Sequence, residues 1–178
     1  GQYLTESVGD AGTLPAQPFT GEAKGQHEEA QWALFWVTGE ATPPAESYVN
    51  LIPTPQGGTH VNGQRAGATD AVREFCEFRN LVPRGLKLAP EDVWTAVAFV
   101  LSVRMQNPQF AGQTKEKLTS RDAYKLVAQM VKDPFELWLN QNVEAGRKLA
   151  ELAIKAAQTR QKAGQKVEKR KGSGVAVL

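Results

Sequence analysis

The chain has 178 residues, of which 41% are hydrophobic and 22% are charged, and its formal net charge is +2. This composition suits one folded domain and excludes wholesale disorder, while so small a net charge does not by itself indicate a polyanionic ligand. The single cysteine, Cys76, excludes an intramolecular disulfide and a cysteine-based zinc site. Because no apolar run is as long as a membrane span and no secretion signal is visible, we expect a cytoplasmic protein without a membrane partner.

The first part of the chain predicts a linker followed by two strands. Residues 1–31 are rich in Gly, Pro, Thr and Ala, so we expect a linker or an irregular edge there. The continuous apolar run WALFWV at residues 32–37 predicts a strand that is buried on both faces. Alternation over residues 46–53 predicts a second strand, and we expect the two strands to pair as a hairpin with residues 39–45 as its loop.

The middle of the chain predicts two helices and a third strand. A helical pattern begins after a Gly-Gly pair, with Thr59 as its expected N-cap, and ends before Pro83. Pro90 is followed by two acidic residues, which is typical of the first turn of a helix. The apolar residues 98–105 predict a strand, and a polar loop at residues 107–118 follows it.

The C-terminal part predicts one long helix. The sequence DPFE around Pro134 is typical of a helix start, so we expect a helix over residues 134–171. Beyond Ala157 this helix is polar on all sides, which indicates that it projects from the body. Residues 172–178 are expected to be disordered or a cut end. The strands and helices of residues 32–133 therefore predict an α+β core, one sheet with helices on one face, with a long terminal helix attached.

The loop NPQFAGQTKEKL at residues 107–118 is the most informative candidate site. Gly112 allows a tight turn, and Lys115 can then present a compact cation to an anion on the other side. A phosphate-binding P-loop is excluded because its glycine and lysine pattern is absent. From the residues alone, a solvated surface loop is favoured and an anion-binding loop stays open.

Three other candidates have simpler structural explanations. The Gly57-Gly58 pair at a helix start could bind an anion through backbone amides, but a turn capped by Thr59 also explains it. No carboxylate or serine stands at a catalytic spacing from His60, and Cys76 lies between two phenylalanines of a predicted helix, as a core thiol does. The sequence contains no metal-binding cluster, catalytic triad or acid pair.

The end of the chain is rich in cations that could contact DNA. These candidates are Lys155, Arg160, Lys162, Lys166, Lys169, Arg170 and Lys171. Like charges at this density along one helix suit a phosphate backbone, because the contacts neutralise phosphates and release counterions. A solubilising helix face is the alternative, and the residues leave both interpretations open.

Two separated motifs resemble the B subunits of gyrase and topoisomerase IV, the ATPase subunits of bacterial type IIA DNA topoisomerases. The first is YVNLIPTPQGGTH at residues 48–60, and the second is NPQFAGQTK at residues 107–115. Within this family, residues 73–80 and 138–142 resemble proteobacterial topoisomerase IV more than gyrase. The resemblance covers the chain from about Phe19 to Lys171.

The resemblance implies a transducer domain with the ribosomal S5 domain 2-like fold, one small mixed sheet with helices on one face. Such a domain stands between an ATPase domain and a metal-binding Toprim domain of the same polypeptide. It implies that Lys115 contacts the γ-phosphate of ATP and that Gln113 positions this phosphate or the attacking water. ATP and Mg would be bound by the complete protein, and this fragment alone is expected to bind neither and to be inactive.

The same resemblance implies a function in DNA topology. Nucleotide-dependent closure would be relayed by the long helix to the DNA gate, for decatenation and relaxation of DNA. The implied partners are duplex DNA, a second copy joined through the ATPase domain, and the A subunit of topoisomerase IV. Two alternatives stay open, namely a gyrase B transducer and a stand-alone nucleic-acid-binding module of S5-like fold.

Overall fold

The computed structural model describes residues 12–38 and 43–176, and it describes side chains for residues 18–38 and 43–165. Its helices and strands, in chain order, are β1 (Gly12–Lys24), β2 (Glu29–Thr38), β3 (Ala45–Val49), β4 (Ile52–Pro53), α2 (Thr59–Arg79), α3 (Pro90–Trp94), β5 (Val97–Arg104), α4 (Arg121–Gln141) and α5 (Val143–Ala176). Strands and helices are mixed along the chain, which confirms the α+β class.

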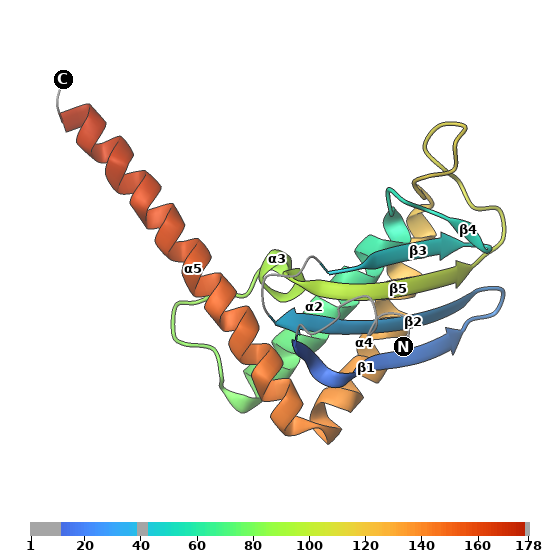
Figure 1. The fold of residues 1–178 in the computed structure, drawn as a ribbon, viewed down its shortest axis with the longest axis horizontal. Coiled ribbons are helices and arrows are strands. Elements are labelled where there is room, and N and C mark those ends of the chain that lie inside the picture. Colours follow the sequence, from blue (N-terminus) through green and yellow to red (C-terminus); the bar gives the residue numbers. More distant parts are fainter. Residues whose placement is uncertain (1–11, 39–42, 177–178) are drawn as a thin grey trace.

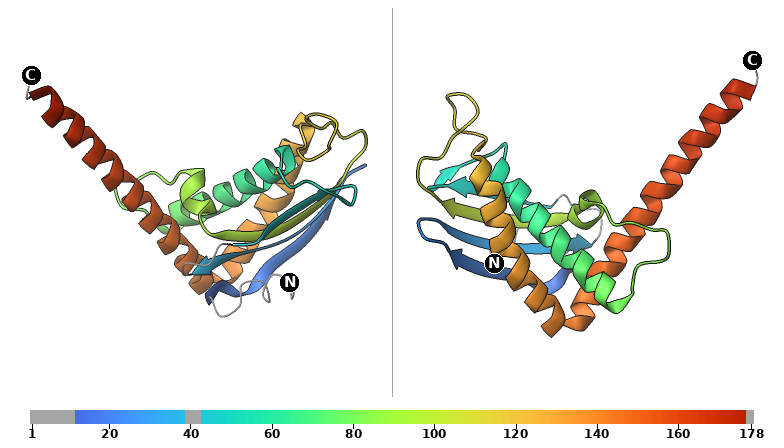
Figure 2. Two further views of the ribbon diagram at one scale, coloured as in Figure 1. Left: turned by 45° about the horizontal axis from the view of Figure 1, so that its top comes forward. Right: turned by 180° about the vertical axis from the view of Figure 1, so that it is seen from behind.

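The strands form one mixed sheet in the order β1-β2-β5-β3-β4. β2 pairs antiparallel with β1 and β5, whereas β3 pairs parallel with β5. α2 and α4 cover one face of this sheet (Figures 1 and 2). The core between them joins aromatic rings of both layers, and Trp36 of β2 stacks on Phe135 of α4 with ring centroids 5.8 Å apart. The predicted single sheet with helices on one face is therefore confirmed.

β2 is the most deeply buried strand of the sheet. Its residues from Trp32 to Val37 are all buried, with Leu34 and Trp36 in the main core. Phe35 points to the other side of the strand and is also inaccessible to solvent. The prediction of a strand buried on both faces is correct.

β1 lies in the segment expected to be a linker. It pairs along β2, and its register shifts between Leu14 and Phe19. The shift spans Pro15 and Pro18, which cannot donate ladder hydrogen bonds and are tolerated on an edge strand. Phe19 is buried, and its ring centroid lies 5.0 Å from that of Phe135. Pairing with an apolar neighbour outweighs the weak strand propensity of this segment.

The expected hairpin between β2 and β3 is wrong, because β5 lies between these two strands. The segment 46–53 is itself a tight hairpin, in which Val49 of β3 pairs with Ile52 of β4. Asn50 and Leu51 form its turn with φ angles of 50° and 68°. Positive φ at both central residues matches the twist of antiparallel strands. β2 and β3 follow each other in the sequence, but in the sheet they are separated by β5, which comes after α2 in the chain.

The predicted helix start at Pro134 is also wrong. α4 runs through this proline to Gln141, and the chain breaks at Asn142 before α5 begins. A proline inside a helix costs about 3 kcal/mol. Here the fully buried residues Val131, Phe135 and Leu139 continue an apolar stripe across it, and their burial offsets that penalty.

α2 and α4 pack closely and in parallel. A Cβ atom on Gly63 would lie 2.5 Å from the Tyr124 carbonyl oxygen, and one on Gly67 would lie 2.5 Å from the Ala128 carbonyl oxygen. Any larger residue would therefore push the helices apart. The Thr59 hydroxyl donates to the Ser120 carbonyl oxygen over 2.6 Å, so it joins the two helix starts. Gly58, and not Thr59 as expected, is the N-cap residue of α2.

Candidate functional site: an exposed loop and a basic helix

The loop between β5 and α4 is anchored at its base by backbone hydrogen bonds. Its outgoing limb, residues 116–119, pairs with the incoming limb through Ala111 N–H to Lys117 O (2.9 Å) and Thr119 N–H to Gln109 O (2.8 Å). On its other side, the outgoing limb pairs with residues 56–59, which lead into α2. The limb is thus the middle strand of a small three-stranded arrangement. This arrangement fixes the base of the loop to the starts of both helices.

The tip of the loop, residues 112–115, is exposed and extends beyond the sheet (Figure 1). Gly112 has φ 71° and Lys115 has φ 56°, so the backbone turns sharply at both ends of the tip. Among the described residues, none is a hydrogen-bond or ion-pair partner of the Gln113 amide or the Lys115 ammonium group. The tip therefore exposes one side-chain amide and one cation to solvent.

Gly57 and Gly58 belong to this loop base. Leu118 N–H donates to Gly57 O, and Thr59 N–H donates to Leu118 O, each over 3.0 Å. Gly58 has φ 135°, and a Cβ atom on it would overlap the Leu118 backbone. Gly58 is therefore needed for the close approach to the loop, and the Thr59 amide is already occupied. Two residues next to this contact, Gln56 and Glu116, were missed by sequence reasoning because they meet only in the folded chain.

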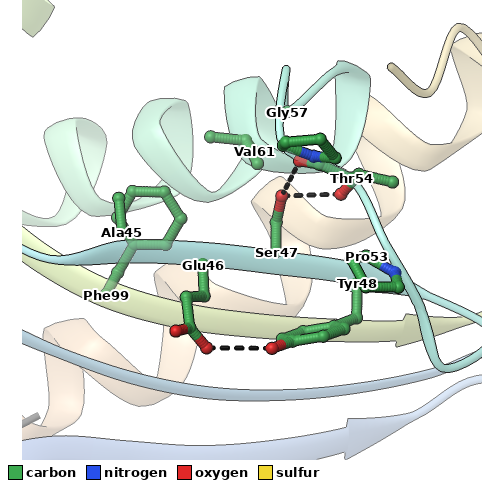
Figure 3. A pocket seen from close by; sticks show the side chains of 10 residues that line it. Ala45, Glu46, Ser47, Tyr48, Pro53, Thr54, Gly57, Val61 and Phe99 are labelled. Carbon is green, nitrogen blue, oxygen red and sulfur yellow. Dashed lines mark hydrogen bonds between the residues drawn. The ribbon is translucent and has the colours of Figure 1, made fainter. Parts of the chain in front are cut away.

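A buried polar chain lies beside a cavity of about 320 Å³ at β3 (Figure 3). The Ser47 hydroxyl donates to the Thr54 carbonyl oxygen (2.9 Å), and Thr54 Oγ1 lies 3.1 Å from His60 Nε2. Burial lowers the pKa of His60 to about 4, so its imidazole is neutral at pH 7. Its Nδ1 has no partner among the described residues, so no carboxylate orients the ring as in a catalytic triad. These groups form a structural network.

Cys76 also has a structural role. It is fully buried, and burial raises the pKa of its thiol to about 11, which keeps the thiolate scarce. Within the described part of the chain, no group of three His, Cys, Asp or Glu side chains could hold a metal ion. None of the described helices has a stretch long and apolar enough to cross a lipid bilayer.

Ala157 is the last buried residue of α5 among its described side chains, and the helix then projects from the body past the contact that Arg160 makes with α3 (Figure 1). We name residues 155–171 the basic arm. Lys155 and Lys162 are exposed on it. The backbone of α5 continues through Lys166, Lys169, Arg170 and Lys171, whose side chains lie outside the described part. The expected projection from the body is confirmed, although the helix begins at Val143 and not at 134.

Arg160 differs from Lys155 and Lys162, the other cations of the arm with described side chains, because it binds within the chain. Its Nε and Nη2 each lie 3.1 Å from an oxygen of the buried Asp92 carboxylate, and Nη2 also donates to the Lys87 carbonyl oxygen. Glu91 lies 3.6 Å away. Asp92 in turn accepts the Ala89 N–H at the start of α3. This cation therefore anchors α5 to α3, a structural role that its charge alone did not indicate.

The loop tip and the basic arm lie at opposite ends of the molecule (Figures 1 and 2). α4 connects them, since its first residue follows the anchored limb of the loop and its last turn leads into α5. The chain thus places the exposed loop cations Lys115 and Lys117 at one end and the exposed arm cations Lys155 and Lys162 at the other, with α4 and the first turns of α5 between them.

The sequence matches the DNA gyrase B family over residues 1–169. It is 60% identical over 169 residues to the B subunit of DNA topoisomerase 4 from Pseudomonas aeruginosa and 57% identical to that of Escherichia coli K12. Each alignment covers 95% of this chain and 27% of the relative. The chain therefore spans about a quarter of the length of these relatives.

Two solved structures are similar over most of the chain. The topoisomerase IV ATP-binding domain of Francisella tularensis, in complex with a small-molecule inhibitor, aligns with a TM-score of 0.79 and 38% identity over 89% of this chain and 42% of that one. The 43K ATPase domain of Thermus thermophilus gyrase B, in complex with an aminocoumarin, aligns with a TM-score of 0.83 and 25% identity over 94% and 45%. More than half of each solved chain lies outside the alignment.

Proposed function

The chain belongs to the DNA gyrase B family, and we propose that it is the transducer domain, of ribosomal S5-like fold, in a topoisomerase IV B subunit. The observation that carries this proposal is the exposed pair Gln113 and Lys115 on a firmly anchored loop. The identity of 57–60% with B subunits of DNA topoisomerase 4 supports the topoisomerase IV kind over gyrase. The complete protein would decatenate and relax DNA together with a second copy, the topoisomerase IV A subunit and its own ATPase and Toprim domains.

In this proposal, Lys115 contacts the γ-phosphate of ATP held by the ATPase domain, and Gln113 positions that phosphate or the attacking water. Phosphoryl transfer depends mainly on positioning and on stabilisation of charge at the transferred group. A lysine ammonium and an amide on an exposed tip fit contacts to a terminal phosphate. In this proposal adenine and Mg are held by the ATPase domain. Among the described residues of this chain, no group of three His, Cys, Asp or Glu side chains could hold a metal ion.

A contact made only with the γ-phosphate makes the orientation of the domain depend on the nucleotide. ATP then favours the arrangement in which the tip is engaged, and hydrolysis removes this preference. α4 transmits the change, because it is joined to α2 by close packing at Gly63 and Gly67 and leads directly into α5. The arm would carry the movement toward the DNA gate.

Calorimetry on the isolated chain tests the domain assignment. We expect no saturable binding of ATP in the low micromolar range, because one lysine and one amide cannot replace an adenine pocket and a magnesium site. The control is the complete protein, which should bind ATP under the same conditions. Tight binding by the isolated chain would contradict the proposal.

We also propose that the basic arm contacts duplex DNA without sequence preference. If about three or four of its cations touch phosphates, log K should fall against log salt with a slope of roughly −3. The test variant replaces four cations of the arm by glutamine, namely Lys162, Lys166, Lys169 and Arg170. The control variant makes the same change at four cations outside α5, namely Arg84, Arg104, Arg121 and Lys125.

Both variants lower the net charge equally, so they separate arm contacts from a general charge effect. We expect a flattened slope for the arm variant and a nearly unchanged slope for the control, with DNA binding followed by fluorescence anisotropy at several salt concentrations. Equal slopes in the arm variant and the unmodified chain would mean that the arm is a solvated helix.

A further inference from the structure

Gln56 contacts the loop at the residue that follows Lys115. Its backbone N–H donates to the Glu116 carbonyl oxygen over 3.0 Å, and its side-chain Nε2 donates to Glu116 Oε2 over 2.8 Å. Glu116 is therefore bound through both its backbone and its carboxylate. Gln56 in turn precedes the glycine pair that is fixed against Leu118, so it belongs to the rigid entry into α2.

The backbone of Lys115 is in a conformation that needs support from its neighbours. Its φ of 56° lies in the left-handed region, which non-glycine residues enter at a cost of about 1–2 kcal/mol. On its N-terminal side, the exposed residues 112–114 lie beyond the Ala111 N–H bond to Lys117. On its C-terminal side, the very next residue, Glu116, is held by two hydrogen bonds to Gln56. The backbone direction at Lys115 is thus fixed by the hydrogen bonds that hold Glu116, the next residue.

We infer that Gln56 and Glu116 are positioning residues for Lys115, an inference that rests on the proposed contact with the γ-phosphate. The pair is at the surface, since Gln56 is exposed and Glu116 is half-buried, so it adds little to the stability of the fold. Its effect is on geometry: it holds the peptide after Lys115 in place before ATP arrives. A group placed in advance stabilises the transition state more than a mobile one.

An exchange of the two side chains tests this role in the complete protein. Gln56→Glu alone removes the amide donor and places a second carboxylate beside that of Glu116, so the two side chains repel each other. We expect kcat for ATP hydrolysis to fall about tenfold with little change in KM. Glu116→Gln alone keeps an amide pair that can still hydrogen-bond, so its kcat should stay within about threefold. The double variant reverses donor and acceptor, and we expect it to recover kcat to within about threefold of the unmodified protein.

Two comparisons make the result specific. Gln129→Glu adds the same charge at an exposed position of α4, away from the loop, and should leave kcat unchanged. The urea midpoint of Gln56→Glu should match that of the unmodified protein, because a positioning role does not depend on loss of fold.

Three outcomes overturn the inference. The first is normal turnover by Gln56→Glu, and the second is no recovery in the double variant. If either occurs while Lys115→Ala still lowers kcat, the proposed function stands and only the positioning role fails. The third is normal turnover by Lys115→Ala itself, which would remove the proposed function and this inference together.

Discussion

Replacement of Gly58 by alanine is expected to destabilise the chain by about 4 kcal/mol. Its φ of 135° belongs to a region that is nearly restricted to glycine, and such a conformation costs other residues about 1–3 kcal/mol. The new Cβ atom would also overlap the Leu118 backbone, and overpacking costs about 1–3 kcal/mol more. Since Leu118 is fully buried and hydrogen-bonded on this side, it cannot move away without breaking the loop base.

Gly85→Ala is the matched control. Gly85 also has a positive φ, 82°, but a Cβ atom there meets nothing within 4 Å. Only the conformational penalty of about 1–2 kcal/mol applies to it. Urea unfolding of both variants should therefore give a clearly lower midpoint for Gly58→Ala than for Gly85→Ala. Equal midpoints would show that the contact between residues 57–59 and Leu118 does not constrain the chain.

The central strands could be predicted from the sequence because their burial leaves a local signal. The run at 32–37 is apolar at every position, and β5 has a similar composition. β1 leaves no such signal, since its prolines and glycines are typical of a loop. It forms because the edge of β2 offers hydrogen bonds and because Phe19 enters the core. The order of the strands also depends on contacts between distant segments.

The junction of α4 and α5 shows why one strong local rule was insufficient. Pro134 is typical of a helix start, and taken alone it predicts a break at that position. The residues Val131, Phe135 and Leu139 repeat at a spacing of four on both sides of it, and this repeat indicates one continuous helix. The break at Asn142 has a weaker signal, an asparagine whose side chain bonds to the Trp138 carbonyl oxygen.

The candidate site could be predicted in part. The sequence motif identified Gln113 and Lys115, and the structure places both on an exposed tip. The groups that hold the tip come from the segment before α2, and they meet it only through pairing of distant residues. Arg160 illustrates the same limit of prediction from sequence. Its charge suggested DNA contact, but the fold also brings it to the buried carboxylate of Asp92, a contact between distant residues.

Loss of the proposed transition-state contact of Lys115 should have the largest effect on turnover. In the complete protein, Lys115→Ala should leave folding and the affinity for ATP almost intact, because the tip is exposed and supports no other described side chain. Turnover should fall by roughly 10²–10³-fold, which corresponds to about 3–4 kcal/mol, the effect expected when one preorganised electrostatic group is lost. Strand passage should fall with it, since the nucleotide-dependent change of orientation would lose its contact.

Lys117→Ala is the control, because Lys117 is an exposed lysine of the same loop that lies in its anchored limb. The measurement that tests the claim most directly is the steady-state rate of ATP hydrolysis at saturating ATP for the two variants and the unmodified protein. We predict that Lys115→Ala loses at least about two orders of magnitude while Lys117→Ala keeps a normal rate. A normal rate for Lys115→Ala, or an equal loss in both variants, would contradict a specific contact between Lys115 and the γ-phosphate.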